Sequence, residues 1–253
     1  YCSGQWENVK KYVERREELL ESRPDLLNDA PHQYINVLGN MLTVQVNLST
    51  GLINSFDVHE RAFHDIMNKL KKFSRSWNSI VGSKEIEQRV FANSTVHELG
   101  FYISRGEFKK AVRVTRKTEK QMSNSSNKIG LSSELAFFYY SAYAHFGNGK
   151  YRNALQYINY LLNNNYFAIR VDLQCFARIL NLLIHYELNN IFVLENAVLH
   201  ARRFIKNKDL LFKYEKNIMS FFRKASLLKF DSKQSERIGL LALRDKLLRA
   251  KKT

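Results

Sequence analysis

The chain has 253 residues, and its 40 Lys and Arg against 24 Asp and Glu give a formal net charge of +16. Hydrophobic residues make up 45% and aromatic residues 13%, so the chain can bury a sizeable core and wholesale disorder is excluded. Ten Gly, two Pro and two Cys are too few for a collagen-like, loop-rich all-β, disulfide-stapled or cysteine-zinc protein. The low cysteine content is typical of a reducing compartment, and we expect a cytoplasmic protein.

Apolar residues recur at spacings of three and four almost throughout, which predicts an all-α protein built from amphipathic helices. Arg23-Pro24 ends the first helix because the residue before proline disfavours the α conformation, and Pro31 lies in the first turn of the next helix. The polar stretch 121–130 is the predicted flexible linker. The predicted helices are 5–22, 31–48, 54–74, 83–104, 107–123, 131–147, 151–164, 169–188, 191–207, 209–229 and 234–250.

The start of the chain indicates a fragment. The first residue is Tyr1, and the first helix reads like the second half of a helical hairpin whose first helix is missing. We therefore expect an N-terminally truncated part of a longer protein. No run approaches the roughly 18 consecutive apolar residues that a membrane-spanning helix needs, so no membrane span is expected.

Four turns share one pattern, in which a Gly or Asn and a polar residue precede an aromatic residue. A small residue in the left-handed conformation lets one helix end and an antiparallel one begin, with the aromatic packed into the pair. Ala111 and Ala154 follow two of these turns at equivalent places, about 43 residues apart, a spacing typical of helical-hairpin arrays. The turns are SGQW (3–6), RGEF (105–108), NGKY (148–151) and LNNIF (188–192).

These features resemble the tetratricopeptide (TPR) repeat. In 134–162, the clearest match, Phe138, Ala142, Tyr151 and Ala154 fall on the family's aromatic, small, turn and second small positions. The segment 95–122 fits through Tyr102, Gly106, Phe108 and Ala111, the segment 34–42 through Leu38 and Gly39, and 188–205 is degenerate. Repeat spacings of about 40–50 exceed the family's usual 34 residues.

The resemblance implies a right-handed α-α superhelix, a solenoid of antiparallel helix pairs, forming one domain over 1–253 with C-terminal capping helices at 209–253. It also implies a non-catalytic protein-protein interaction scaffold that holds a partner protein or peptide in a concave groove. Carried onto this sequence, the groove positions are Tyr139, Tyr143 and Phe146. Because these are aromatic, the carboxylate clamp of the family's chaperone-tail binders is not expected. The alternative is that this aromatic row is core.

Catalytic motifs fail on spacing, so we expect no enzyme, no metal and no cofactor. His59 and His64 are five residues apart instead of the four of a zinc-binding HExxH helix, which puts them on different faces. The stretch 147–150 lacks the third Gly and the Ser or Thr of a phosphate loop, and is predicted to be a turn. Cys175 lies in an apolar helix and is predicted to be an inert buried thiol.

The basic residues are unevenly distributed, because residues 1–30 carry no excess of positive charge. Lys109, Arg113, Arg116 and Lys120 recur at helical spacing opposite Ala111, and form a predicted polyanion-binding stripe. This stripe supports the alternative function, a sequence-nonspecific nucleic-acid or polyanion-binding module. The other interpretation of the stripe is an ordinary solvated helix face without a binding role. Two further clusters are Arg202, Arg203, Lys206, Lys208, Lys213 and Lys216, and a C-terminal set that begins at Arg223.

Overall fold

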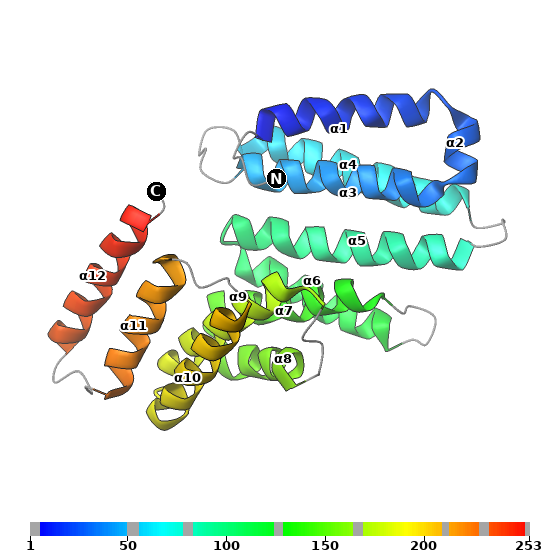
Figure 1. The fold of residues 1–253 in the computed structure, drawn as a ribbon. Helices are drawn as coiled ribbons and strands as arrows, with labels where there is room; N and C mark the ends of the chain where they lie inside the picture. Colours follow the sequence, from blue (N-terminus) through cyan, green and yellow to red (C-terminus); the bar gives the residue numbers. More distant parts are fainter. Residues whose placement is uncertain are drawn as a thin grey trace. The chain divides into compact units, whose positions relative to one another are not determined.

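The computed structural model describes residues 6–49, 56–77, 83–123, 129–163, 169–208, 213–227 and 233–250. These ranges contain twelve helices and no strand, so the all-α prediction is confirmed (Figure 1). The helices are α1 (Trp6–Glu21), α2 (Pro24–Asp29), α3 (Pro31–Ser49), α4 (Phe56–Ser76), α5 (Ser83–Ser104), α6 (Phe108–Met122), α7 (Leu131–Gly147), α8 (Tyr151–Asn163), α9 (Val171–Glu187), α10 (Ile191–Asn207), α11 (Lys213–Leu227) and α12 (Lys233–Ala250).

The sequence pattern found every helix except α2. Pro24 and Pro31 stand at the first positions of α2 and α3, where a missing N–H costs nothing because that N–H has no partner in the helix. With only six residues, α2 is too short to produce a helical period. The predictions for residues 3–5 of the first turn, for 124–128 of the polar linker and for 209–212 lie outside the described residues.

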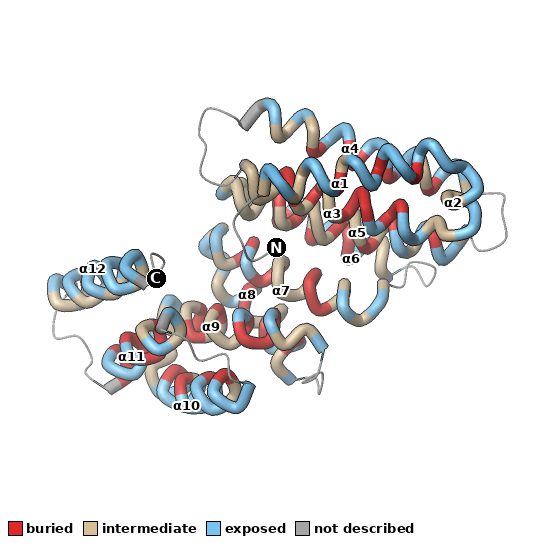
Figure 2. Tube along the Cα trace, turned by 45° about the horizontal axis from the view of Figure 1, so that its top comes forward, coloured by how far each residue is buried: buried red, intermediate tan, exposed pale blue. Residues whose placement is uncertain are grey.

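The chain divides into two compact units, Tyr1–Asn148 and Gly149–Thr253, and the single continuous array stays a prediction. In the first unit α1 packs on α3, α3 on α5 and α5 on α7, while α4 packs on α3 and α5, and α6 on α5 and α7. In the second unit each helix from α8 to α12 packs on the next. Most helices of these arrays combine a buried stripe with an exposed one (Figure 2), whereas α2 and α12 have no buried residue among those that the structure describes.

Three of the predicted turns have the predicted left-handed residue. Gly106, Gly149 and Asn189 have φ of 70°, 69° and 55°, and each is the middle residue of a three-residue turn between helices. Two of these turns close with a 6→1 hydrogen bond, from the N–H of Glu107 to the Tyr102 carbonyl and from the N–H of Asn190 to the His185 carbonyl. Ala111 and Ala154, the predicted small positions, are fully buried.

The first unit has its main core between α1, α3, α4 and α5. Phe63 of α4 stacks on Phe101 of α5 with ring centroids 4.1 Å apart, and both side chains are at most 1% exposed. Lys69 of α4 binds Glu17 of α1 at 2.7 Å, which ties the first helix to this core. The second unit has a core formed by α9, α10 and α11, on which Leu243 and Leu247 of α12 also pack.

Three histidines with a lowered pKa, His97 and His145 in the first unit and His185 in the second, make stability depend on pH. The Nδ1 of His97 donates to the Asn93 carbonyl at 2.8 Å, and its Nε2 lies 3.1 Å from the Thr43 hydroxyl. Burial lowers the pKa of His97, and likewise the pKa of His185, below the usual 6.5. The unfolded chain therefore takes up protons near pH 6.5 while the folded chain does not, so stability is complete above that pH and falls as the pH drops through it.

We expect the free energy of unfolding to decrease from pH 7.5 to pH 5, as measured by urea unfolding at several pH values. The His97→Gln and His185→Gln variants should show a shallower decrease, because glutamine does not titrate. His200, which is exposed on α10, supplies the control: His200→Gln should keep the wild-type pH dependence. A dependence that is unchanged in both buried-histidine variants would contradict the assignment.

Candidate basic groove

The predicted polyanion stripe lies on α6 as expected. Lys109, Arg113, Arg116 and Lys120 are all exposed, while Ala111, Val112, Thr115 and Thr118 form the buried face opposite. Within the described ranges none of these four cations pairs with a carboxylate. The stripe is therefore an open cationic surface, and its role in binding stays a prediction.

The predicted aromatic row lies along α7. Tyr143 is 38% exposed, whereas Tyr139 and Phe146 are half-buried. The Tyr139 and Tyr143 rings are 6.2 Å apart, and Tyr143 also lies 6.4 Å from the ring of Phe108 at the start of α6. The row is thus partly engaged in packing within the first unit, and its assignment as a partner groove stays a prediction.

The residues of the rejected catalytic motifs have structural partners. His59 lies 2.8 Å from the Gln45 side chain, and His64 lies against Glu60 and the Phe101 ring. Residues 148–150 form the turn between α7 and α8. Cys175 is buried, and burial raises the pKa of its thiol, which makes the reactive thiolate scarce. Groups of three His, Cys, Asp or Glu side chains that could hold a metal ion do not occur in the parts of the chain that the structure describes.

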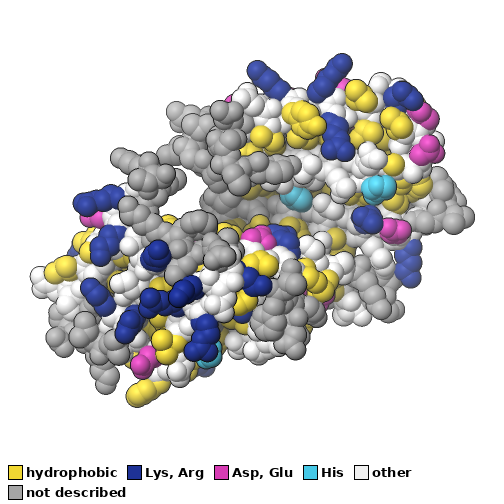
Figure 3. All heavy atoms as spheres, in the orientation of Figure 1, with side chains coloured by type: hydrophobic (Ala, Val, Ile, Leu, Met, Phe, Trp, Pro, Cys, Tyr) yellow, Lys and Arg dark blue, Asp and Glu magenta, His cyan; other side chains and the backbone are white. Residues whose placement is uncertain are grey.

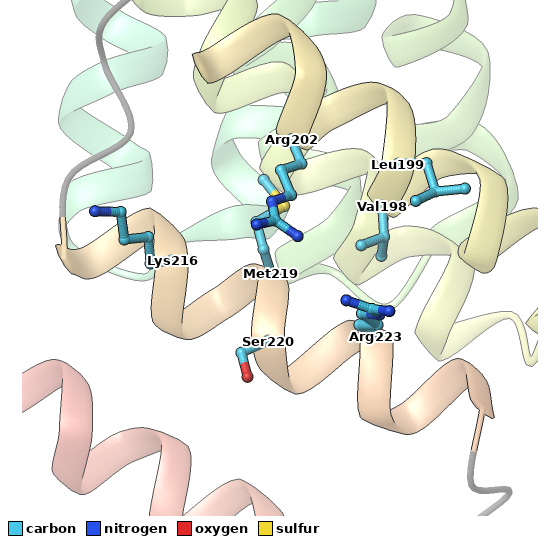
Figure 4. Close-up of a pocket in the computed structure, with 7 residues that line it drawn as sticks. All are labelled: Val198, Leu199, Arg202, Lys216, Met219, Ser220 and Arg223. Atoms are coloured by element: carbon cyan, nitrogen blue, oxygen red, sulfur yellow. The ribbon is translucent and has the colours of Figure 1, made fainter.

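The second unit brings together cations that are far apart in the sequence. Arg202 of α10 and Lys216 and Arg223 of α11 line a groove of about 270 Å³ between these two helices, which we call the basic groove (Figure 4). Arg202 extends from α10 toward Met219 of α11, and Arg223 reaches up from α11 below Val198 (Figure 4). Leu199 and Ser220 complete the lining.

The charges of the basic groove are uncompensated. In the described part of the second unit, neither arginine nor Lys216 forms an ion pair or a hydrogen bond with another side chain. Figure 3 shows Lys and Arg side chains gathered over the second unit, where Figure 1 has α10 and α11. Electrostatic attraction to an anionic group is therefore not offset by carboxylates in the lining.

The basic groove also has apolar contact area. Val198 and Met219 are buried at 3% and 4% exposure and form part of its lining, whereas Leu199 is 53% exposed. A second pocket, between α4, α5 and α6, shows the contrast, because its cations Lys71, Arg75 and Lys117 share the lining with Glu87 and Glu98. Val198 and Met219 thus form an apolar floor of the groove. The combination of unpaired cations and this apolar floor favours a ligand that carries both carboxylates and apolar side chains.

The sequence places Arg202 and Lys216 in one basic cluster and Arg223 in another, and does not show that they line one groove. The usable signal is the spacing of Lys216, Ser220 and Arg223, which puts them on one face of α11. Which face of α10 lies opposite depends on helix packing, and the periodicity of α11 carries no information about it.

Comparisons of the chain with models of known protein families, with curated proteins and with solved structures give no match. The structure itself shows that helices pack on their neighbours in chain order within each unit. Among the described helices none combines the length and the apolar character needed to cross a bilayer. The resemblance to TPR proteins rests on the turns and the small residues.

Proposed function

We propose that the chain is a non-catalytic interaction scaffold with a TPR-like superhelical arrangement, and that it binds an acidic segment of a partner protein. The observation that carries this proposal is the basic groove, in which cations from two helices flank an apolar floor without a carboxylate in its lining. A peptide with alternating acidic and apolar side chains offers carboxylates to Arg202 and Arg223, and apolar groups to Leu199 and the floor. The aromatic row of α7 is a further contact surface in this proposal.

A second candidate function is sequence-nonspecific nucleic-acid or polyanion binding through the α6 stripe. It is favoured by the exposure of all four cations on one helix face. Phosphates need cations but no apolar floor, and binding of this kind weakens steeply with salt. The two candidates therefore differ in the surface they use and in the ligand they prefer.

The test compares two probes, a fluorescent peptide of alternating Glu and Leu and a single-stranded oligonucleotide, with fluorescence anisotropy as the readout. We expect the peptide to bind to the wild-type chain. The double variant Arg202→Glu, Arg223→Glu should lower the affinity for the peptide at least tenfold, because each reversed charge contact is worth about 1–3 kcal/mol. The matched control is Arg113→Glu, Arg116→Glu, which reverses two charges on α6 and should leave peptide binding unchanged.

Equal peptide affinity of the wild type and the α10/α11 double variant would refute the basic groove as the binding site. Binding of the oligonucleotide alone, lost both in the α6 variant and at moderate salt, would establish the second candidate instead. Thermal unfolding of each variant shows whether a loss of binding reflects a loss of fold.

A further inference from the structure

A second concave site in the same unit has different chemistry. It is a pocket of about 380 Å³ that is lined by residues of α8, α9 and α10. On α10 it uses Ala197, His200 and Ala201, and therefore shares no residue with the basic groove. Its size is within the usual range for small-molecule sites. The remaining lining residues are Asn159, Leu162, Asn163, Arg178 and Asn181.

Arg178 of α9 is held rigidly in this pocket. Its guanidinium carbon lies 3.5 Å from the centroid of the Phe204 ring, and its Nη1 donates to the Gln174 carbonyl at 2.8 Å and to the Gln174 side-chain oxygen at 3.0 Å. Stacking on an aromatic ring fixes the plane of a guanidinium and leaves its edges open for hydrogen bonds. Burial also lowers the pKa of Arg178, because the charged form loses hydration without gaining a carboxylate.

One edge of this guanidinium has no acceptor. Arg178 donates only from Nη1 to residues that the structure describes, so its Nε and Nη2 make no hydrogen bond with them. The same edge binds a carboxylate elsewhere in the chain. The Nε and Nη2 of Arg23 donate to the two oxygens of Asp25 at 3.1 and 2.8 Å, and those of Arg170 donate to Asp172 at 3.0 and 2.8 Å.

The other polar residues of the pocket suit an anion as well. Asn181 lies one helical turn from Arg178 and makes no hydrogen bond with the described chain, so its side-chain NH₂ can donate to a bound anion. Asn159, Asn163 and His200 add side chains that can donate hydrogen bonds, and the lining contains no Asp or Glu.

We propose that this pocket binds a small ligand through its carboxylate or phosphate group, with two oxygens on the Nε and Nη2 edge of Arg178 and the Asn181 amide beside them. Both groups present two oxygens at the spacing that a guanidinium edge accepts. This site is independent of the proposed scaffold function, because the basic groove lies on the other flank of α10.

The test uses the full chain labelled with ¹⁵N and titrated with inorganic phosphate and, separately, with acetate. We expect a saturable shift of the Arg178 Nε–H signal with at least one anion. Arg178→Lys keeps the positive charge but loses the paired N–H donors of the guanidinium edge, and should lower the affinity for that anion at least tenfold. The matched control is Arg203→Lys, which makes the same change at an exposed position of α10 and should leave the affinity unchanged.

Tighter binding of phosphate would identify a phosphate ester as the ligand, and tighter binding of acetate a carboxylic acid. The shift of the Arg178 Nε–H signal should persist in the double variant Arg202→Glu, Arg223→Glu. The proposals for the pocket and for the basic groove can therefore be refuted independently. A wild-type Nε–H signal that does not move, or moves linearly with both anions, would overturn the proposal. The titration of the wild type tests anion binding at Arg178 even if the Arg178→Lys variant does not fold.

Discussion

Replacing Phe101 by alanine is expected to lower the free energy of unfolding of the first unit by about 3–5 kcal/mol. Phe101 is fully buried, stacks on Phe63 and meets the Tyr102 ring edge-on at 5.7 Å. Its ring joins α4 to α5, and the Arg105 guanidinium lies 5.2 Å from its centroid. Alanine would remove this contact area and leave a cavity that a packed helical core fills only partly.

The chain offers a selective readout for this change. Its two tryptophans, Trp6 and Trp77, both lie in the first unit, so tryptophan fluorescence during urea unfolding follows that unit alone. The control is Tyr12→Ala, another aromatic truncation in the first unit, at a side chain that is 70% exposed. It should change the free energy of unfolding by about 0.5 kcal/mol or less. A loss below about 1 kcal/mol for Phe101→Ala would contradict the buried stack.

The helices could be predicted from the sequence because their signals are local. The 3-4 spacing of apolar residues and the left-handed Gly106, Gly149 and Asn189 are each determined within a few residues of the chain. The one missed helix, α2, has no such signal because its six residues hold only one pair of apolar side chains. Local patterns therefore predicted where helices begin and end, and also which face of α6 is exposed.

The candidate binding surfaces could be predicted only in part, because they depend on which helices meet. The α6 stripe lies on one helix and was visible as a spacing. The basic groove is lined by Arg202 of α10 and by Lys216 and Arg223 of α11. The pocket at Arg178 is lined by residues of three helices. Arg178 did carry one sequence signal, since it is the single charged residue between Leu173 and Leu183. A charge within an apolar helix indicates a buried partner or a ligand.

Replacing Gly147 by alanine is expected to lower the free energy of unfolding of the first unit by about 1–3 kcal/mol. Gly147 is the last residue of α7, and its Cα faces the ring of Phe108 at the start of α6 so closely that an added Cβ would overlap three ring atoms. An aromatic ring packed between two helices cannot move aside as the end of a flexible side chain does. Relief therefore requires α6 and α7 to separate at this end.

Gly100→Ala provides the matched control, because Gly100 lies inside α5 and an added Cβ there meets no atom within 4 Å. Alanine should stabilise that position by about 0.5–1 kcal/mol, since glycine loses more conformational freedom when a helix forms. The same substitution thus has opposite expected signs at two helical glycines of one unit, both read by tryptophan fluorescence. A second variant, Gly147→Ala combined with Phe108→Leu, should recover part of the loss if the overlap with the ring is its cause. If Gly147→Ala stabilises the unit as Gly100→Ala does, then the close approach of α6 and α7 at Phe108 is wrong.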